Sequence, residues 1–159
     1  AGVEKILINS ASYFDARLID QAARKFGSQC IVAGIDYRII SDGSIICFSK
    51  LGKSKSDLDV VLRAKQLESM GAGELLLTSI DDDGLMRGYD CNTIRMVAES
   101  VNLPIIASGG AGNYNHMLEA LRAGAAAVAA ASMFHFTEQT PHNAKHFLSD
   151  NGIPVRLGI

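Results

Sequence analysis

The chain has 159 residues, 48% of them hydrophobic, and a formal net charge of −2. This length favours one domain with a substantial core, and the charge balance argues against a nucleic-acid partner. No apolar run approaches the roughly 20 residues that span a bilayer, and the sequence shows no signal peptide. The three cysteines are odd in number and lack metal-like spacing. We therefore expect reduced thiols in a cytoplasmic protein with no metal and no membrane contact.

Strand-like and helix-like segments alternate along the chain. Five apolar segments read as buried strands, at residues 5–9, 30–36, 74–79, 104–108 and 126–131. Segments of helical character follow them, at residues 15–26, 58–70, 91–101, 114–123 and 141–150. Turn residues at 41–44 lie between two β-prone runs, 37–40 and 45–48, and predict a hairpin after the second strand. The sequence therefore predicts an α/β fold of five strand–helix units with parallel strands.

Two architectures fit five such units. A doubly wound open sheet would be complete with five strands, whereas a (βα)8 barrel needs eight units and about 250 residues. All five strands end in polar residues or glycine. A barrel uses every strand end around one mouth, whereas an open sheet uses those near its switch point. The chain also begins almost directly with a strand and without Met, as the interior of a longer protein would.

The ends of the last two strands predict a phosphate site. One is followed by the run Ser108-Gly109-Gly110-Ala111-Gly112, and the other by Ala131 and Ser132. Glycine frees backbone N–H groups and permits close approach of a ligand. In barrels, the loops after the last two strands often hold phosphate at a short helix N-terminus.

Carboxylates at strand ends are candidates for acid–base chemistry. Asp36 ends the second strand, where it could act as a general acid or base, cap a helix, or pair with Arg38. Among the three acids after the third strand, Asp83 is the better candidate because Gly84 follows it, and Asp82 is expected to face solvent.

The opposite ends of two strands carry Lys5 and Glu74, for which surface ion pairing is the simplest interpretation. His142 and His146 are spaced like metal ligands but lack a third ligand, so we expect no metal there.

The sequence resembles the cyclase subunit of imidazole glycerol phosphate synthase, from histidine biosynthesis. The resemblance covers essentially the whole chain. The matching stretches are Phe26-Gly-Ser-Gln29, Gly71-Ala-Gly-Glu-Leu-Leu-Leu-Thr-Ser-Ile80, Asp83-Gly84, Gly88-Tyr-Asp90, Pro104-Ile-Ile-Ala-Ser-Gly-Gly-Ala-Gly112 and Ala129-Ala-Ala-Ser-Met-Phe-His-Phe136. It implies a lyase on a (βα)8 TIM barrel. Residues 1–159 would form a partial barrel domain, units four to eight, with the first three units absent.

The resemblance also implies roles for individual residues. Asp36 and Asp83 would be catalytic. One phosphate of the substrate would bind at Gly84, Gly109, Gly110, Ala131 and Ser132, and the other at Asn9 and Ser10, with Thr78 and Ser108 lining the same mouth. The implied reaction joins ammonia to a phosphoribulosyl-formimino aminoimidazole carboxamide nucleotide. It yields imidazole glycerol phosphate and the carboxamide ribotide, and it requires no metal or redox cofactor.

A partner is implied as well. In the family, a glutaminase subunit docks on the amino-terminal face of the barrel and sends ammonia along its axis, as a heterodimer. Lys5 and Glu74 would belong to the charged gate at that entrance, and Glu4 to the partner contact.

Two departures from the family pattern bear on function. The first-strand catalytic aspartate is missing, so we expect this chain alone to be inactive and its exposed edges to be covered by an N-terminal segment or by self-association. Asp82 and Leu85 replace a basic residue and a threonine, which would suit a paralogue that supplies ammonia for sugar amidation in surface-polysaccharide pathways. A third hypothesis is a non-catalytic half-barrel that serves as an assembly module.

Overall fold

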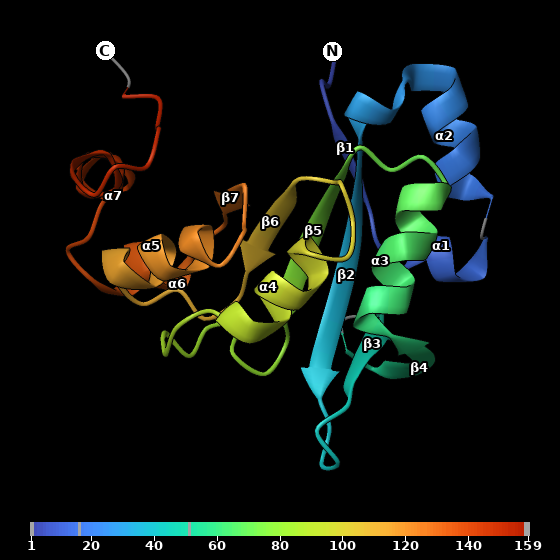
Figure 1. The fold of residues 1–159 in the computed structure, drawn as a ribbon, viewed down its shortest axis with the longest axis horizontal. Coiled ribbons are helices and arrows are strands. Elements are labelled where there is room, and N and C mark those ends of the chain that lie inside the picture. Colours follow the sequence, from blue (N-terminus) through green and yellow to red (C-terminus); the bar gives the residue numbers. More distant parts are fainter. Residues whose placement is uncertain (1, 16, 51, 158–159) are drawn as a thin grey trace.

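The computed structural model describes residues 2–15, 17–50 and 52–157 (Figure 1). Its strands are β1 (Ile6–Ile8), β2 (Ile31–Ile39), β3 (Ile45–Ser49), β4 (Ser54–Asp59), β5 (Glu74–Ser79), β6 (Ile105–Ser108) and β7 (Ala127–Val128). Its helices are α1 (Ala11–Phe14), α2 (Leu18–Phe26), α3 (Val60–Ser69), α4 (Cys91–Ala98), α5 (Tyr114–Arg122), α6 (Ser132–Phe136) and α7 (Pro141–Asp150), with a 3-10 turn at Ser28–Cys30. None of the helices in the described ranges is long and apolar enough to cross a membrane.

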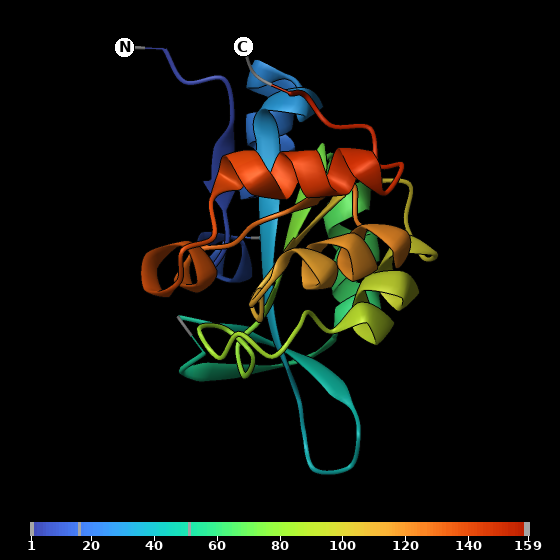
Figure 2. The ribbon, with the colours of Figure 1, turned by 90° about the vertical axis from the view of Figure 1, so that its left-hand side faces the viewer.

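The parallel strands follow one another in chain order, β1, β2, β5, β6 and β7. A doubly wound sheet would reverse this order at a switch point. Right-handed crossovers between consecutive neighbours place the connecting helices on one face. Accordingly α3 packs on β2, α4 on β6 and α5 on β7, and α7 lies beside α5 (Figure 2). The predicted parallel α/β fold is confirmed, and its winding is that of about half a (βα)8 barrel.

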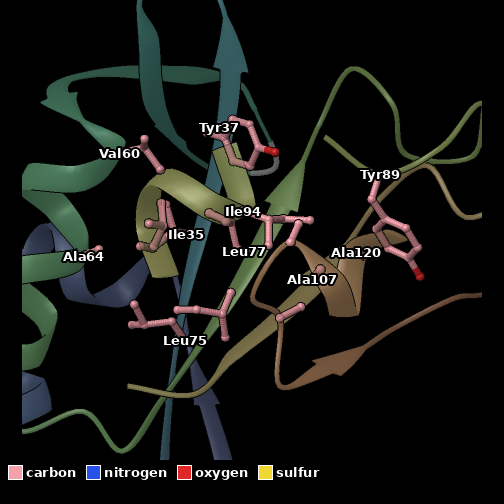
Figure 3. Packing of buried hydrophobic residues seen from close by; sticks show 14 of the residues in the cluster. Ile35, Tyr37, Val60, Ala64, Leu75, Leu77, Tyr89, Ile94, Ala107 and Ala120 are labelled. Carbon is pink, nitrogen blue, oxygen red and sulfur yellow. The ribbon is translucent and has the colours of Figure 1, made fainter. Parts of the chain in front are cut away.

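The two faces of the sheet differ in chemistry. Side chains at alternate positions, including Ile35, Leu75 and Leu77, are almost fully buried against the helices, where Ile94 of α4 packs on them (Figure 3). The intervening positions of β5 are only half-buried and point to the opposite, inner face. That face carries the polar strand ends, so the helical layer anchors the strands while the inner face displays the site.

The predicted hairpin is confirmed. β2 runs on to Ile39 and pairs antiparallel with β3, with Ile39 opposite Ile45. β1 and β3 pair with the same edge of β2. β1 pairs with its first residues, and β3 pairs with it from Asp36 onward. The long central strand is therefore flanked by one parallel and one antiparallel neighbour along a single edge.

Several predicted boundaries were wrong. The expected helix 15–26 begins at Leu18 and is preceded by the separate short helix α1. The expected helix 58–70 begins at Val60, because Asp59 caps it by accepting from the N–H groups of Val61 and Leu62. Residues 54–59 form β4, which pairs with β3.

Candidate active site

Asp36 lies within β2 beside the end of β1. Parallel pairing sets Ile8 opposite Ala33, which brings Asn9 alongside Gly34. A Cβ atom at Gly34 would lie 2.8 Å from the Cβ of Asn9, so only glycine leaves room for this side chain. Asn9 Nδ2 then donates a hydrogen bond to Asp36 Oδ1 at 2.9 Å.

The alternative roles considered for Asp36 do not match its position. It is a strand residue and caps no helix. Arg38 pairs instead with Asp81, at 3.2 Å between Nε and Oδ1. The Asp36 carboxylate is therefore left free for Asn9 and for the open face of the sheet.

The environment of Asp36 favours its protonated form. Burial raises the pKa of its carboxyl group above the usual value, and the negative charge of Asp83 acts in the same direction. The hydrogen bond from Asn9 opposes both effects. The charge of a carboxylate from a neighbouring strand end thus acts on Asp36, an arrangement suited to proton transfer.

Thr78 and Ser108 continue the row that begins at Asp36. The strand register sets Asp36 opposite Thr78, and Thr78 opposite Ser108. All three are half-buried and share the inner face. The row leads to a cavity of about 140 Å³ at the ends of β5, β6 and β7. Its lining consists of Asp83, Gly84, Ser108, Gly109, Gly110, Ala111, Ala129, Ala130, Ala131 and Ser132.

Backbone packing fixes the glycine loop that lines this cavity. Gly110 has φ +100°, and a Cβ there would lie 1.9 Å from the carbonyl oxygen of Gly88. A Cβ at Gly112 would lie 2.1 Å from the carbonyl oxygen of Met86. Gly88 N–H donates to the Gly110 carbonyl at 2.8 Å, which ties the β5–α4 loop to the β6–α5 loop. Glycine is therefore required here for close contact between two loops as well as for access to a ligand.

The acids after β5 separate into different environments. Asp83 is exposed and lines the cavity. The prediction that Asp82 faces solvent was wrong, because it is half-buried and accepts a hydrogen bond from Ser79 Oγ at 2.6 Å. Asp81 pairs with Arg38.

The second predicted phosphate site lies at the β1 end of the row. Ser10 precedes α1, and its Oγ accepts a hydrogen bond from the backbone N–H of Lys50 at 2.8 Å. Lys50 has the unusual φ of 54° for a non-glycine residue. Asn9 contacts Asp36 and Ser10 follows it in the chain, at the edge of β2 away from β5, β6 and the glycine-lined cavity.

The amino-terminal ends of the strands carry the other predicted residues. Lys5 and Glu74 form an ion pair between β1 and β5, as the sequence suggested. Glu4 is exposed next to them. Glu4 and Lys5 border a cavity of about 320 Å³ together with Val3, Ile6, Phe26, Cys30 and Ile31.

Two residues that shape the site were not predicted from the sequence. Gly34 makes room for Asn9, and an isolated glycine within a strand could have indicated such a close approach. Ser12 on α1 donates its hydroxyl to the Asn9 carbonyl at 2.7 Å and is 1% exposed. No pattern in the sequence marked Ser12.

Comparisons with known proteins identify the family of this chain. Residues 1–140 match the model of a family described as histidine biosynthesis protein. The chain is 46% identical over 158 residues to a protein of Hydrogenobaculum sp. (strain Y04AAS1) named imidazole glycerol phosphate synthase subunit HisF. That alignment covers 99% of this chain but 63% of the relative, so the chain spans less than two thirds of the curated relative's length. The chain belongs to the histidine biosynthesis protein family, and within it resembles HisF.

Proposed function

We propose that this chain forms units four to eight of a (βα)8 cyclase barrel. The intact protein would be a cytoplasmic lyase that uses ammonia to convert the phosphoribulosyl-formimino nucleotide into imidazole glycerol phosphate and aminoimidazole carboxamide ribotide. The observation that carries the proposal is the position of Asp36. It is held by Asn9, has a pKa raised by burial and by Asp83, and lies between two candidate anion sites.

In this proposal the two phosphates of the substrate lie at opposite ends of the polar row. The cavity with Gly84, Gly110 and Ser132 would hold one, with backbone N–H groups as donors. Asn9 and Ser10 would contact the other. Asp36 and Asp83 would then exchange protons with the bound nucleotide between them.

The partner would be a glutaminase subunit on the amino-terminal face. Lys5, directly before β1, forms an ion pair with Glu74, the first residue of β5, and the other ends of these two strands reach the proposed substrate site. Paired charges at this entrance would admit small neutral ammonia while restraining water. Glu4, exposed beside a largely apolar cavity, would contact the partner.

The direct test uses the intact natural protein, ammonium and the formimino nucleotide, with release of imidazole glycerol phosphate as the readout. Asp36→Asn keeps the size of the side chain but cannot transfer a proton, so we expect a loss of roughly 10²- to 10⁴-fold in kcat. The matched control is Asp42→Asn, at the exposed hairpin turn, which should leave kcat unchanged. An unaltered kcat for Asp36→Asn would contradict the proposal.

A second candidate function is supply of ammonia for sugar amidation by a surface-polysaccharide paralogue. Leu85, 49% exposed and next to Gly84 of the cavity, is the observation that favours it, because the family usually has threonine there. An intact protein that takes up glutamine-derived ammonia but releases no imidazole glycerol phosphate would support this candidate. A protein with neither activity would support the assembly module.

A further inference from the structure

Arg63 is buried in an unusual way for a charged side chain. It lies on α3, is 3% exposed, and forms no ion pair with a carboxylate in the described part of the chain. Its guanidinium lies over the Tyr13 ring at 4.2 Å from the centroid, and its Nε has no hydrogen-bond partner. Removing an arginine charge from water costs several kcal/mol unless other contacts compensate. A hydrophobic residue would fill this place at lower cost, so packing alone does not account for Arg63.

The hydrogen bonds of Arg63 lead toward the proposed active site. Nη2 of Arg63 donates to Ser12 Oγ at 2.6 Å. Ser12 Oγ donates in turn to the carbonyl oxygen of Asn9 at 2.7 Å, and its backbone N–H donates to the same oxygen at 3.0 Å. Asn9 Nδ2 completes the series by donating to Asp36 Oδ1.

We infer that Arg63 is a positioning residue that acts through Ser12 and Asn9 to hold the Asp36 carboxylate in place. Arg63 contacts α1 at two residues, through its hydrogen bond to Ser12 and its cation–π contact with Tyr13. The loop between β1 and α1 is thereby fixed to α3, a helix of ten residues. Neither Arg63 nor Ser12 touches the open face where a substrate would lie, since both are buried.

The inference rests on the proposed function in one respect, namely that Asp36 is a reacting group. Its structural content can be tested without any activity. The titratable group that faces Asp36 is Asp83, from the β5–α4 loop. Cys47 of β3 lies opposite Tyr37 in the antiparallel register, and so on the other face of the sheet from Asp36. Because the hydrogen bond from Asn9 lowers the pKa of Asp36, loosening Asn9 should raise that pKa further.

The experiment compares Arg63→Met and Ser12→Ala in the intact natural protein, with Lys65→Met as control. Lys65 is exposed on the same helix, and its replacement by Met removes the same charge as Arg63→Met. The carboxyl ¹³C resonance of Asp36, assigned with Asp36→Asn, is titrated by NMR in each variant. We expect Arg63→Met and Ser12→Ala each to raise the pKa of Asp36. The double variant should give no larger shift than the larger of the two single variants. In Lys65→Met the pKa of Asp36 should equal that of the wild type.

Kinetics supply the second measurement. Misplacement of a reacting group by about 1 Å can cost roughly 10²-fold, so both variants should lower kcat by about 10- to 100-fold with little change in KM. A shift in Arg63→Met without one in Ser12→Ala would show an effect of charge alone and overturn the inference, as would no shift in either. If Arg63→Met fails to fold, Ser12→Ala, which loses one oxygen atom, decides the question. If the protein has no cyclase activity, the proposed function fails while the NMR titration still tests the positioning role.

Discussion

At the carboxyl ends of β5 and β6, glycine backbones lie directly against other backbones, whereas at the amino ends of β1 and β5 two side chains meet in solvent. The β6–α5 loop is held by contacts with Gly88 and Met86 that leave no space for a side chain. The Lys5–Glu74 pair has exposed fractions of 48% and 22% for its two side chains. The two loops at the carboxyl end are therefore fixed by backbone contact, whereas Lys5 and Glu74 are joined only through their side chains. A preorganised ligand site suits the first end and an adaptable docking face suits the second.

The largest effect should follow from placing a side chain in the fixed end. Gly110→Ala puts a Cβ against the Gly88 carbonyl at a φ of +100°, and should lower the free energy of unfolding by about 3 kcal/mol or more. The matched control is Gly43→Ala at the hairpin tip, where φ is +85° but no atom lies within 4 Å of the new Cβ. That control should cost about 1 kcal/mol from backbone strain alone. Urea unfolding measures both, and equal losses would contradict the difference between packed and open glycines.

A smaller effect, of opposite sign, is expected at Asp36. Its pKa is raised in the folded protein, so its contribution to stability is full below the unfolded pKa and is lost as pH rises through the folded value. Asp36→Asn cannot ionise and should therefore be more stable than wild type at pH 7.

The pH dependence of unfolding checks this prediction. The difference between Asp36→Asn and wild type should disappear near pH 3, where both side chains are neutral. Glu74→Gln, at the other end of the sheet, serves as control and should give no gain at pH 7. A gain that persists unchanged at pH 3 would point to packing instead of charge.

The smallest effect should come from the ion pair itself. Exposed pairs contribute about 0.2–1 kcal/mol, so Lys5→Met should change the free energy of unfolding by about 0.5 kcal/mol. A double-mutant cycle with Glu74→Gln isolates the coupling, which should shrink in 1 M salt. A coupling several-fold larger and insensitive to salt would show that the amino end is as firmly built as the carboxyl end.

The sequence predicts the strands well where burial on one face is continuous. β5 matches its predicted range of 74–79 because every second side chain is fully buried against the helices. The alanine-rich segment 126–131 contains only the two-residue strand β7, because alanine contributes little side-chain packing to a sheet. β4 was missed because Ser54–Asp59 has four polar or charged residues in its first four positions, and it owes its place to pairing with β3.

The candidate site was predictable where chemistry is concentrated in short motifs. The stretches around Asp83 and Gly110 stand out in the sequence because they are rich in acids and in glycine, and both line the same cavity in the structure. Contacts made through buried polar side chains could not be predicted in the same way. From the sequence, Arg63 would be expected at an exposed position of a helix and Asp82 in an exposed loop. Each instead forms a hydrogen bond, Arg63 with Ser12 and Asp82 with Ser79, that depends on the tertiary fold.

The hairpin that extends β2 is a suitable place to attach a label. It projects beyond the rest of the sheet (Figure 1). A Cβ added at Gly43, at its tip, would have no atom within 4 Å, and Ser41 and Ser44 on either side are exposed. Exposed tips of this kind tolerate insertions and labels. The tip is the continuation of the strand that carries Asp36, which is hydrogen-bonded to neighbours on both sides. A fluorophore can thus be attached at Ser44 without altering any side chain of the polar row formed by Asp36, Thr78 and Ser108.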